Sequence, residues 1–343
     1  MEYLIGNKET FLTFLNKITK EDKIAILSHD DLDGIASCIF LEKILEKKGL
    51  KTEFTKFISI KPEMLKNKSD ELKKIGITKI FIADISCESI DKENFQILKK
   101  NIDTLLIDHH PISPELEDKT GIIKTESHNC ATLLIFELGK ELIDVKEWAW
   151  LICATMFAEY SYTTKENLDF MKTFYPELTE ENIATSIPGM NARKISNALI
   201  YFDKDLKHVY EIILKKDMEE LAHAFKIIED ELNKSTEDFS KNKTEFKDKK
   251  IYWYEMSPKF NIASIVATIT SKIIPEYSFL IATKDGEYTK ISARNQSGNA
   301  NMNLLMKKGI EGLEDANGGG HTKASAARIK TKDLEKFKEN ILK

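Results

Sequence analysis

The sequence predicts an α/β protein whose larger part is a doubly wound, mainly parallel sheet. Short apolar runs, each with the length of a buried strand, alternate with segments whose apolar residues recur at helical spacing. This alternation continues through the first half of the 343 residues, which favours parallel strands joined by crossover helices. Strand-like runs return near the C-terminus and predict a second, smaller α/β domain.

The first half contains most of the expected strands. Apolar runs at residues 23–28, 52–60, 79–84 and 104–108 are expected to be strands, with residues 121–124 as a fifth. Helices are expected at residues 35–48 and 62–75, each ended by a glycine, and again before residue 104. Two further helices are expected at residues 131–142 and 146–160.

The remaining segments set the expected domain boundaries. Residues 164–242 are expected to be helical and charged, and the polar run at 235–250 to be a linker. Strands are then expected at 251–256, 277–285, 287–294 and 324–329, with helices at 262–274, at 303–313 and at the C-terminus. The expected divisions are therefore residues 1–165, a helical connector and linker at 166–246, and a second domain at 247–343.

Composition restricts the functional class. Apolar residues make up 42% of the chain, as in ordinary globular proteins. The net charge of −5 argues against a long electrostatic track for DNA, although acidic metal ligands count as negative here without their metals. The four cysteines form no CxxC pair, no apolar run could span a bilayer, and the N-terminus lacks a signal-peptide pattern. We therefore expect a cytoplasmic protein without membrane attachment.

The segment SHDDLDGIAS directly follows an expected strand and carries the first candidate site. It places His29, Asp31 and Asp33 at alternate positions. Carboxylates and imidazole clustered at a strand end suit Mn²⁺ or a similar ion. Gly34 then allows a tight entry into a helix whose N-terminus favours anions. The alternative for the aspartates is a polar turn or a helix cap.

Two other strand ends carry candidate ligands. Asp84 closes the run KIFIAD, at the edge of a parallel sheet where ligands bind in such folds. Asp108, His109 and His110 close another apolar run. Adjacent histidines project in different directions, so one could ligate a metal while its neighbour faces a substrate. The alternatives are a helix cap at Asp84 and an unremarkable pair of histidines.

The last motif is GGGH, in the expected second domain. Gly318, Gly319 and Gly320 would let a phosphate approach backbone N–H groups, and His321 adds a donor. Arg294 could clamp a phosphate through its guanidinium. The alternatives are a bare glycine-rich turn and a solvated surface arginine.

Together these segments resemble the DHH phosphoesterase superfamily. The order matches: an HxDxDG segment, a strand-end Asp, DHH, and then a C-terminal DHH-associated domain with GGGH. The resemblance covers most of the chain and is weakest in the helical middle. Within the superfamily, HxDxDG is similar to the RecJ-like, archaeal-type single-strand exonucleases. The phosphatase pattern instead has its His four residues before the first metal-binding Asp.

The resemblance implies two divalent ions at the strand ends. His29, Asp31 and Asp84 would hold one ion, and Asp33, Asp84, His109 and a further acidic residue the other. The family normally supplies that last ligand as an Asp after an apolar helix, where this sequence offers Glu159. Asp108 would orient the histidines, His110 would face the scissile phosphate, and His321 and Arg294 would grip substrate.

Mixed imidazole and carboxylate ligands favour Mn²⁺ over Mg²⁺, with Co²⁺ as another possibility. Such a pair of ions activates a water for in-line attack on phosphorus, so the resemblance implies hydrolysis without a covalent protein intermediate.

Three functions remain open at the level of sequence. The first is a RecJ-like exonuclease on single-stranded DNA or RNA, favoured by HxDxDG and the helical connector. The second is a small-substrate phosphodiesterase or phosphatase, acting as a nanoRNase or on cyclic dinucleotides or phosphoadenosine phosphate, favoured by the compact length and acidic charge. The third is a catalytically weak replication scaffold that binds GINS-type partners. Glu159 supports the scaffold, whereas the otherwise complete ligand set counts against it. Replication or repair proteins are the expected protein partners of this chain.

Overall fold

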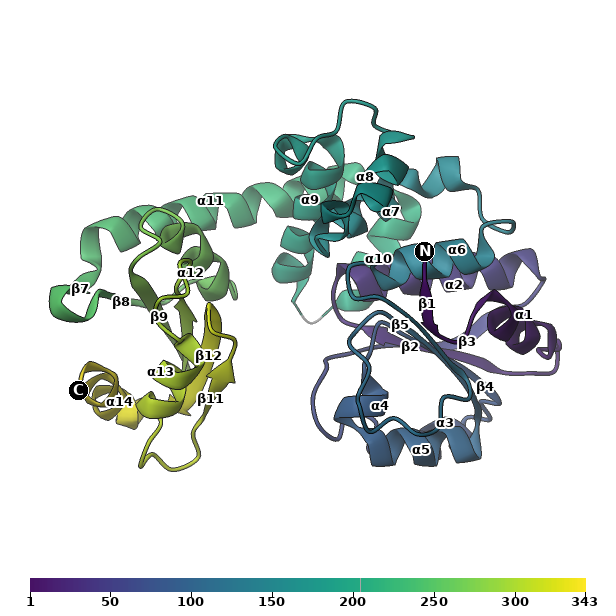
Figure 1. Cartoon of the computed structure of the whole chain (residues 1–343), viewed down its shortest axis with the longest axis horizontal. Coiled ribbons are helices and arrows are strands. Elements are labelled where there is room, and N and C mark those ends of the chain that lie inside the picture. Colours follow the sequence, from purple (N-terminus) through teal and green to yellow (C-terminus); the bar gives the residue numbers. More distant parts are fainter. Residues whose placement is uncertain (204) are drawn as a thin grey trace. The chain divides into compact units, whose positions relative to one another are not determined.

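A six-stranded sheet frames the first of two structural units, Met1–Ala222 (Figure 1). The computed structural model describes residues 1–203 and 205–343. The strands, in chain order, are β1 (Tyr3–Ile5), β2 (Ile24–His29), β3 (Thr52–Ile58), β4 (Lys79–Ala83), β5 (Asp103–Asp108) and β6 (Ile122–Thr125). Their order in the sheet is β1-β6-β5-β4-β2-β3. Every neighbouring pair is parallel except the edge strand β1 with β6.

Helices cover both faces of this sheet, which confirms the doubly wound α/β class. Figure 1 shows α2 (Leu32–Lys47) and α6 (Ala131–Gly139) on one face. On the other lie α3 (Lys68–Lys74), α4 (Cys87–Ile90) and α5 (Lys92–Asn101). Leu27 and Ile82 of the central strands belong to the same buried core as Phe95 and Leu98 of α5. The apolar runs therefore form strands because both of their faces are covered.

Parts of the first unit differ from the structure that the sequence predicted. The helix expected at residues 62–75 begins only at Lys68, because Asn67 has a left-handed backbone (φ 62°) that a continuing helix cannot include. The edge strand β1 was not expected at all. It is only three residues long and is defined by its pairing with β6, more than a hundred residues away in the chain.

The chain then becomes helical, as expected. After α1 (Lys8–Asn16) near the N-terminus, the later helices are α7 (Val145–Ala158), α8 (Lys165–Lys172), α9 (Ile187–Phe202), α10 (Leu206–Lys215) and α11 (Met218–Asn242). The linker expected at residues 235–250 is wrong, because α11 continues to Asn242 and a short strand, β7 (Thr244–Phe246), follows. Buried Leu232 and Phe239 lie seven residues apart on α11, so the polar run has one apolar side.

The second unit, His223–Lys343, has its own six-stranded sheet in the order β11-β12-β10-β9-β8-β7. It contains β8 (Ile251–Met256), β9 (Ser278–Asp285), β10 (Tyr288–Arg294), β11 (Asn317–Gly320) and β12 (Ala324–Lys330). Its helices after α11 are α12 (Ala263–Ser271), α13 (Met302–Gly309) and α14 (Leu334–Leu342). Ile291 and Ile329 share a buried core with Phe337 of α14. The expected second α/β domain is thus confirmed.

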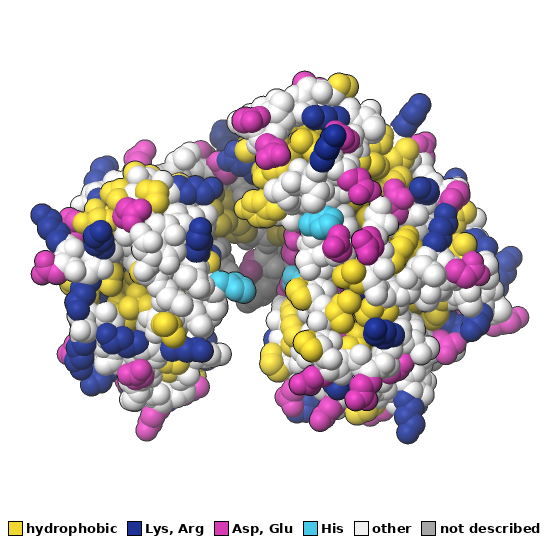
Figure 2. Space-filling model, viewed as in Figure 1, with side chains coloured by type: hydrophobic (Ala, Val, Ile, Leu, Met, Phe, Trp, Pro, Cys, Tyr) yellow, Lys and Arg dark blue, Asp and Glu magenta, His cyan; other side chains and the backbone are white. Residues whose placement is uncertain are grey.

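The surface carries charge of both signs. Figure 2 shows Lys and Arg side chains scattered among Asp and Glu over the visible face of each unit, without a broad field of one sign. Among the residues that the structure describes, none of the helices combines the length and apolar character that crossing a membrane requires.

Candidate metal centre

Three strand ends meet at one edge of the first sheet. β2 pairs with β4, and β4 pairs with β5, all in parallel, so their C-terminal ends lie side by side. His29 ends β2, Asp84 follows β4, and Asp108 ends β5. The topology therefore gathers the candidate ligands where parallel sheets bind their ligands.

Asp84 lies at the centre of this cluster. Its Oδ2 is 3.4 Å from His29 Nδ1, and its Oδ1 is 3.3 Å from His109 Nε2. Among the residues that the structure describes, two groups of side chains are spaced closely enough to hold a cation: His29 with Asp31 and Asp84, and Asp84 with His109 and His110. Asp84 belongs to both groups, and its two oxygens face different imidazoles.

The backbone of Asp84 is strained. Its φ of 59° lies in the left-handed region, which costs a non-glycine residue roughly 1–3 kcal/mol. Aspartate tolerates this conformation better than most residues. The Asp84 N–H donates to Ile107 O at 3.0 Å, which anchors the turn to the neighbouring strand β5. Strain of this kind concentrates at functional sites, where the surrounding structure maintains it.

Asp31 uses its two oxygens differently. Oδ1 accepts the Gly34 N–H at 2.9 Å and so caps α2, whereas Oδ2 lies 2.8 Å from His29 Nδ1. A Cβ on Gly34 would lie 2.2 Å from the carbonyl oxygen of His29, so only glycine allows this tight entry into the helix. The capping alternative for Asp31 is thus present together with a carboxylate oxygen in the cluster.

Asp33 is fully buried and holds the N-terminus of α6. Its Oδ2 accepts the Ala131 N–H at 2.7 Å, and its Oδ1 accepts the N–H and hydroxyl of Thr132 at 2.8 and 2.6 Å. Oδ2 also lies 3.7 Å from His109 Nε2. In the described part of the chain, Asp33 belongs to neither closely spaced group, so its role as a ligand stays a prediction.

The two adjacent histidines have different partners. The His109 Nδ1–H donates to Ser127 O at 3.4 Å, which leaves Nε2 directed at Asp84. The His110 Nδ1–H donates to Asp108 Oδ1 at 2.7 Å. Metal-binding histidines usually donate their second ring N–H to a carbonyl or carboxylate in this way. His109 therefore has the environment of a metal ligand.

The electrostatics of the cluster suit a cation. Burial lowers the pKa of His29, but hydrogen bonds with Asp31 and Asp84 outweigh it and raise this pKa to about 11. Burial is likewise outweighed at His109, where Asp84 and Asp33 raise the pKa to about 10. Both imidazoles are thus protonated at neutral pH, and each positively charged ring is surrounded by carboxylates. Because these protons lie where a cation would neutralise the same carboxylates, the donor set fits a bound divalent metal.

Glu159 lies within electrostatic reach of the cluster. It directly follows α7, and the next residue, Tyr160, has a left-handed backbone with φ of 56°. Burial raises the pKa of Glu159 to about 7, and the charges of Asp31 and Asp84 add to the effect. The structure thus places a carboxyl near the ligands where the sequence suggested one. Whether Glu159 binds metal stays a prediction.

A buried ion network behind the histidines was missed at the level of sequence. Asp108 Oδ2 lies 2.8 Å from Lys124 Nζ, and Glu88 pairs with the same ammonium. Although burial opposes it, His110 and Lys124 hold the pKa of Asp108 well below its usual range. The sequence did hold one signal for this network. A lysine ends the apolar run GIIK, which was expected to be a strand with both faces covered by helices, so its side chain could be expected to be buried.

The GGGH motif lies in the second unit, at an edge of its sheet. Gly318, Gly319 and Gly320 belong to strand β11 and pair with β12, so they form a strand and not a turn. Gly320 has a φ of 142°, and a Cβ there would lie 2.8 Å from Ala324 O. The exposed His321 donates its backbone N–H to the same Ala324 O at 2.8 Å.

Arg294 lies at the same end of the sheet as His321, since β10 pairs Arg294 with Ala324. Its Nε donates to Thr268 Oγ1 at 3.1 Å and its Nη1 to Ala293 O at 2.9 Å. The partly buried guanidinium is thus held in place with other N–H groups left for a ligand.

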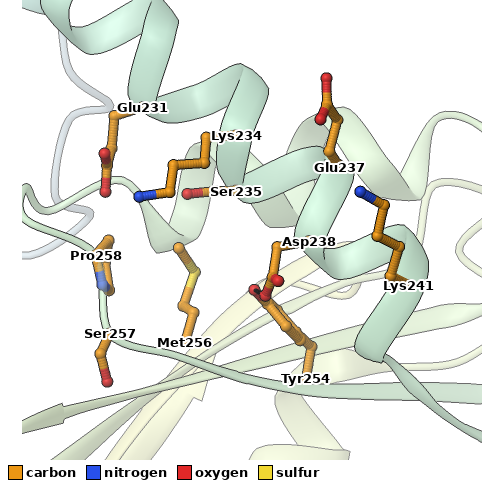
Figure 3. Close-up of a pocket in the computed structure, with 10 residues that line it drawn as sticks. All are labelled: Glu231, Lys234, Ser235, Glu237, Asp238, Lys241, Tyr254, Met256, Ser257 and Pro258. Carbon is orange, nitrogen blue, oxygen red and sulfur yellow. Dashed lines mark hydrogen bonds between the residues drawn. The ribbon is translucent and has the colours of Figure 1, made fainter.

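Two pockets of the second unit differ in their relation to these residues. One, of about 480 Å³, is lined by Gly318 and Gly319 together with Lys290 and Arg328, basic residues that were missed at the level of sequence. Figure 3 shows the other, of about 250 Å³, where Lys234 of α11 lies opposite strand β8. None of the predicted site residues lines this second pocket.

Comparisons with known proteins agree with this architecture. Residues 23–162 match the model of the DHH family, N-terminal domain, and residues 251–343 match the DHHA1 domain. The first match contains the candidate metal ligands, and the second contains Arg294 and the GGGH motif. No curated protein sequence matches the chain.

Solved structures of related fold cover nearly the whole chain. The manganese-bound exonuclease RecJ has a TM-score of 0.73 at 12% identity, covering 97% of this chain and 92% of that one. RecJ from Thermus thermophilus with Mn²⁺ has a TM-score of 0.69 at 12% identity, covering 98% of this chain and 54% of that one. This chain therefore spans about half the length of the Thermus protein.

CDC45 from Entamoeba histolytica has a TM-score of 0.60 at 12% identity, covering 98% of this chain and 97% of that one. At such identities these likenesses establish the fold, and the two family matches establish the lineage. The chain belongs to the DHH superfamily, with an N-terminal DHH domain and a C-terminal DHHA1 domain.

Proposed function

We propose that this protein is a metal-dependent phosphodiesterase that degrades single-stranded nucleic acid from an end and releases nucleotides. One observation carries the proposal: Asp84 is shared by two groups of side chains that could each hold a cation. A carboxylate with one oxygen directed to each group would help to hold both ions. Paired ions are a common device of phosphoryl-transfer enzymes.

The ligand assignment combines the contacts of the cluster with the ligand pattern that the family resemblance implies. We assign His29, Asp31 and Asp84 to one ion, and Asp33, Asp84, His109 and Glu159 to the other. His110 approaches Asp84 through Nδ1, at 3.9 Å, and that nitrogen donates to Asp108. We therefore assign His110 to the substrate and not to a metal.

The ions, when bound, polarise the phosphoryl oxygens and acidify a water. The chain's own groups do the positioning. Asp108 holds the His110 ring, whose side chain is 31% exposed, so that Nε2 is the nitrogen available to a phosphate oxygen. In the second unit, Arg294 and the backbone N–H groups of the GGGH strand are suited to bind phosphates of the substrate.

Mn²⁺ is the ion that we propose. Its preference for mixed imidazole and carboxylate ligands matches a cluster built from His29, Asp84 and His109. The RecJ structures of similar fold were solved with Mn²⁺ or Mg²⁺. Mg²⁺ and Co²⁺ are the alternatives. Comparing the activity of the metal-free protein after addition of each ion would distinguish the three metals.

The single-strand substrate rests on the RecJ-like HxDxDG segment and on the fold shared with exonuclease RecJ along almost the whole chain. The test uses purified protein with Mn²⁺ and end-labelled strands of two and about twenty nucleotides, as DNA and as RNA. Progressive loss of mononucleotides from the long strand supports the proposal and gives the polarity. Asp84→Asn is the control for contaminating nucleases.

Cleavage of only the dinucleotides would instead support a small-substrate phosphodiesterase. A second candidate function is a replication scaffold, because the likeness to CDC45 covers 98% of this chain and 97% of that one. Stoichiometric metal binding without cleavage of any strand would favour this candidate and would overturn the proposed nuclease. Replication or repair proteins would then be the partners to search for.

A further inference from the structure

We propose that Lys124 is a positioning residue of the phosphoesterase site and that it fixes Asp108 and through it His110. This inference rests on the proposed function, because it assigns a role within the same site. Neither Lys124 nor Glu88 lies among the candidate metal ligands or touches a group that we assign to the metals.

Lys124 is placed by sheet register. It lies in β6 directly beside Asp108 of β5, and neighbouring residues of parallel strands extend their side chains to the same face. Both side chains are completely buried. The Lys124 ammonium lies 2.8 Å from Asp108 Oδ2 and also contacts the carboxylate of Glu88 in α4.

The same ammonium holds the backbone that follows Asp108. Lys124 Nζ donates to His110 O at 3.1 Å and lies 3.4 Å from Pro111 O. Glu88 lies in α4, four residues after Asp84. One buried cation thus ties the segment carrying the two histidines to the helix that follows the central carboxylate.

The position of a lysine here needs an explanation. Burying charged groups costs several kcal/mol per ion, and replacing a buried ion network by apolar residues is often neutral or stabilising. Buried Ile122, two residues earlier on the same face of β6, shows that an apolar residue fits on this side of the sheet. Stability alone therefore does not explain why a lysine occupies position 124. A site that needs one fixed orientation of the Asp108 carboxylate does explain it.

Asp108 divides its oxygens between the two partners. Oδ1 accepts the His110 Nδ1–H at 2.7 Å, while Oδ2 faces Lys124. Because Oδ2 is fixed, the carboxylate cannot rotate about its axis, and the His110 ring keeps the orientation that leaves Nε2 for a substrate. Without the ammonium, Asp108 would keep His110 as its only charged partner among these contacts.

The main test is a double variant, Lys124→Met with Glu88→Met, which removes an opposite pair of charges and fills the space with side chains of similar volume. Removing both members avoids the uncompensated buried charge that a single substitution leaves. Glu88→Gln is the matched control, because it retains the contact between Lys124 and Asp108. Both variants are first compared with the native protein for folding and for bound Mn²⁺.

We expect the double variant to bind Mn²⁺ normally and to hydrolyse the labelled strand with kcat lowered on the order of 10- to 100-fold and KM nearly unchanged, as misplaced catalytic groups give. Glu88→Gln should keep most of the native kcat. A native kcat in the double variant would overturn the proposal. Reduced Mn²⁺ binding with a native kcat for the molecules that do hold Mn²⁺ would also overturn the proposal, because it would show that Lys124 supports only the structure of the site.

Lys124→Gln keeps a donor for Asp108 and is used if the double variant does not fold. It should lower kcat in the same direction but by less, and unchanged kcat counts against the role.

The imidazole ¹⁵N shifts of His110 provide a readout without turnover. In the double variant we expect these shifts to lose the signature of an Nδ1–H bound to a carboxylate. If the native protein cleaves nothing, the proposed function fails. Unchanged ¹⁵N shifts in the double variant would separately refute the role of Lys124 in positioning His110.

Discussion

The hydroxyl of Thr132 donates to the carboxylate of Asp33 across 2.6 Å, between side chains that are both fully buried. The Thr132 N–H donates to the same oxygen at 2.8 Å. Asp33 therefore joins the first turn of α2 to the N-terminus of α6, where a negative charge is favoured by the helix dipole. A residue that the sequence suggested as a ligand also connects two helices.

Thr132→Val should destabilise the protein without removing the metals. The substitution takes one donor from a buried carboxylate, which we expect to lower the free energy of unfolding by roughly 1–3 kcal/mol. Urea unfolding of the metal-free protein measures this change. The control is Thr155→Val, because the buried Thr155 hydroxyl donates to a backbone carbonyl within its own helix. Equal stability of the two variants would contradict the importance of the contact with Asp33.

Asp84→Asn should abolish activity while preserving the fold. Asparagine tolerates the left-handed backbone at this position, so the variant tests the carboxylate and not the strain. We expect loss of both ions and a fall in turnover on the order of 100-fold or more, comparable with removing a key charge-stabilising group. Turnover and calorimetric metal stoichiometry are measured together, with Asp118→Asn on the surface as control. Near-native activity would remove the two-metal proposal.

The main parts of the centre could be predicted because strand ends are readable from local sequence. His29, Asp84 and His109 each follow an apolar run, and parallel topology then places them together. The role of Asp33 at α6 could not be read in this way. Its partners lie 98 and 99 residues away, and only the packing of two helices brings them together.

Long-range pairing also decided the other features that sequence missed. Lys124 neighbours Asp108 because β6 adopts one register beside β5, and a shift by one residue would send its side chain to the opposite face. The three glycines at 318–320 form a strand because β12 pairs with them. In the supposed linker, the Phe239 ring packs edge-on against Tyr254 of β8, a contact that composition alone does not reveal.

Metal binding should release protons. In the metal-free protein, the pKa values of about 11 for His29 and about 10 for His109 keep both imidazoles protonated at pH 8. A cation can bind these nitrogens only after their protons leave. Affinity for Mn²⁺ should therefore rise as the pH increases from about 7 to about 9. Calorimetry in two buffers of different ionisation enthalpy measures the released protons, and His29→Gln should release fewer. Identical heats in both buffers would contradict this coupling.

Glu159 should respond differently to shortening and to neutralisation. Glu159→Gln removes a carboxylate from the neighbourhood of Asp31 and Asp84, and we expect Mn²⁺ affinity to fall at least about tenfold, equal to roughly 1.4 kcal/mol. Glu159→Asp retains the charge that the family normally supplies here and should keep or raise activity. Metal titrations and turnover compare the two. An inactive Glu159→Asp protein that still binds metal would mean that the longer side chain sets the geometry.

His321→Ala should act on substrate binding more than on chemistry. The His321 backbone is fixed by the bond from its N–H to Ala324 O, while its side chain is exposed at the edge of the sheet. Removing the imidazole should therefore leave folding intact and raise KM by several-fold, with kcat close to native, as expected for binding that is equal in ground and transition states. Steady-state kinetics on the labelled strand measure both constants, with His208→Ala in α10 as control. A large fall in kcat at constant KM would instead show that His321 stabilises the transition state.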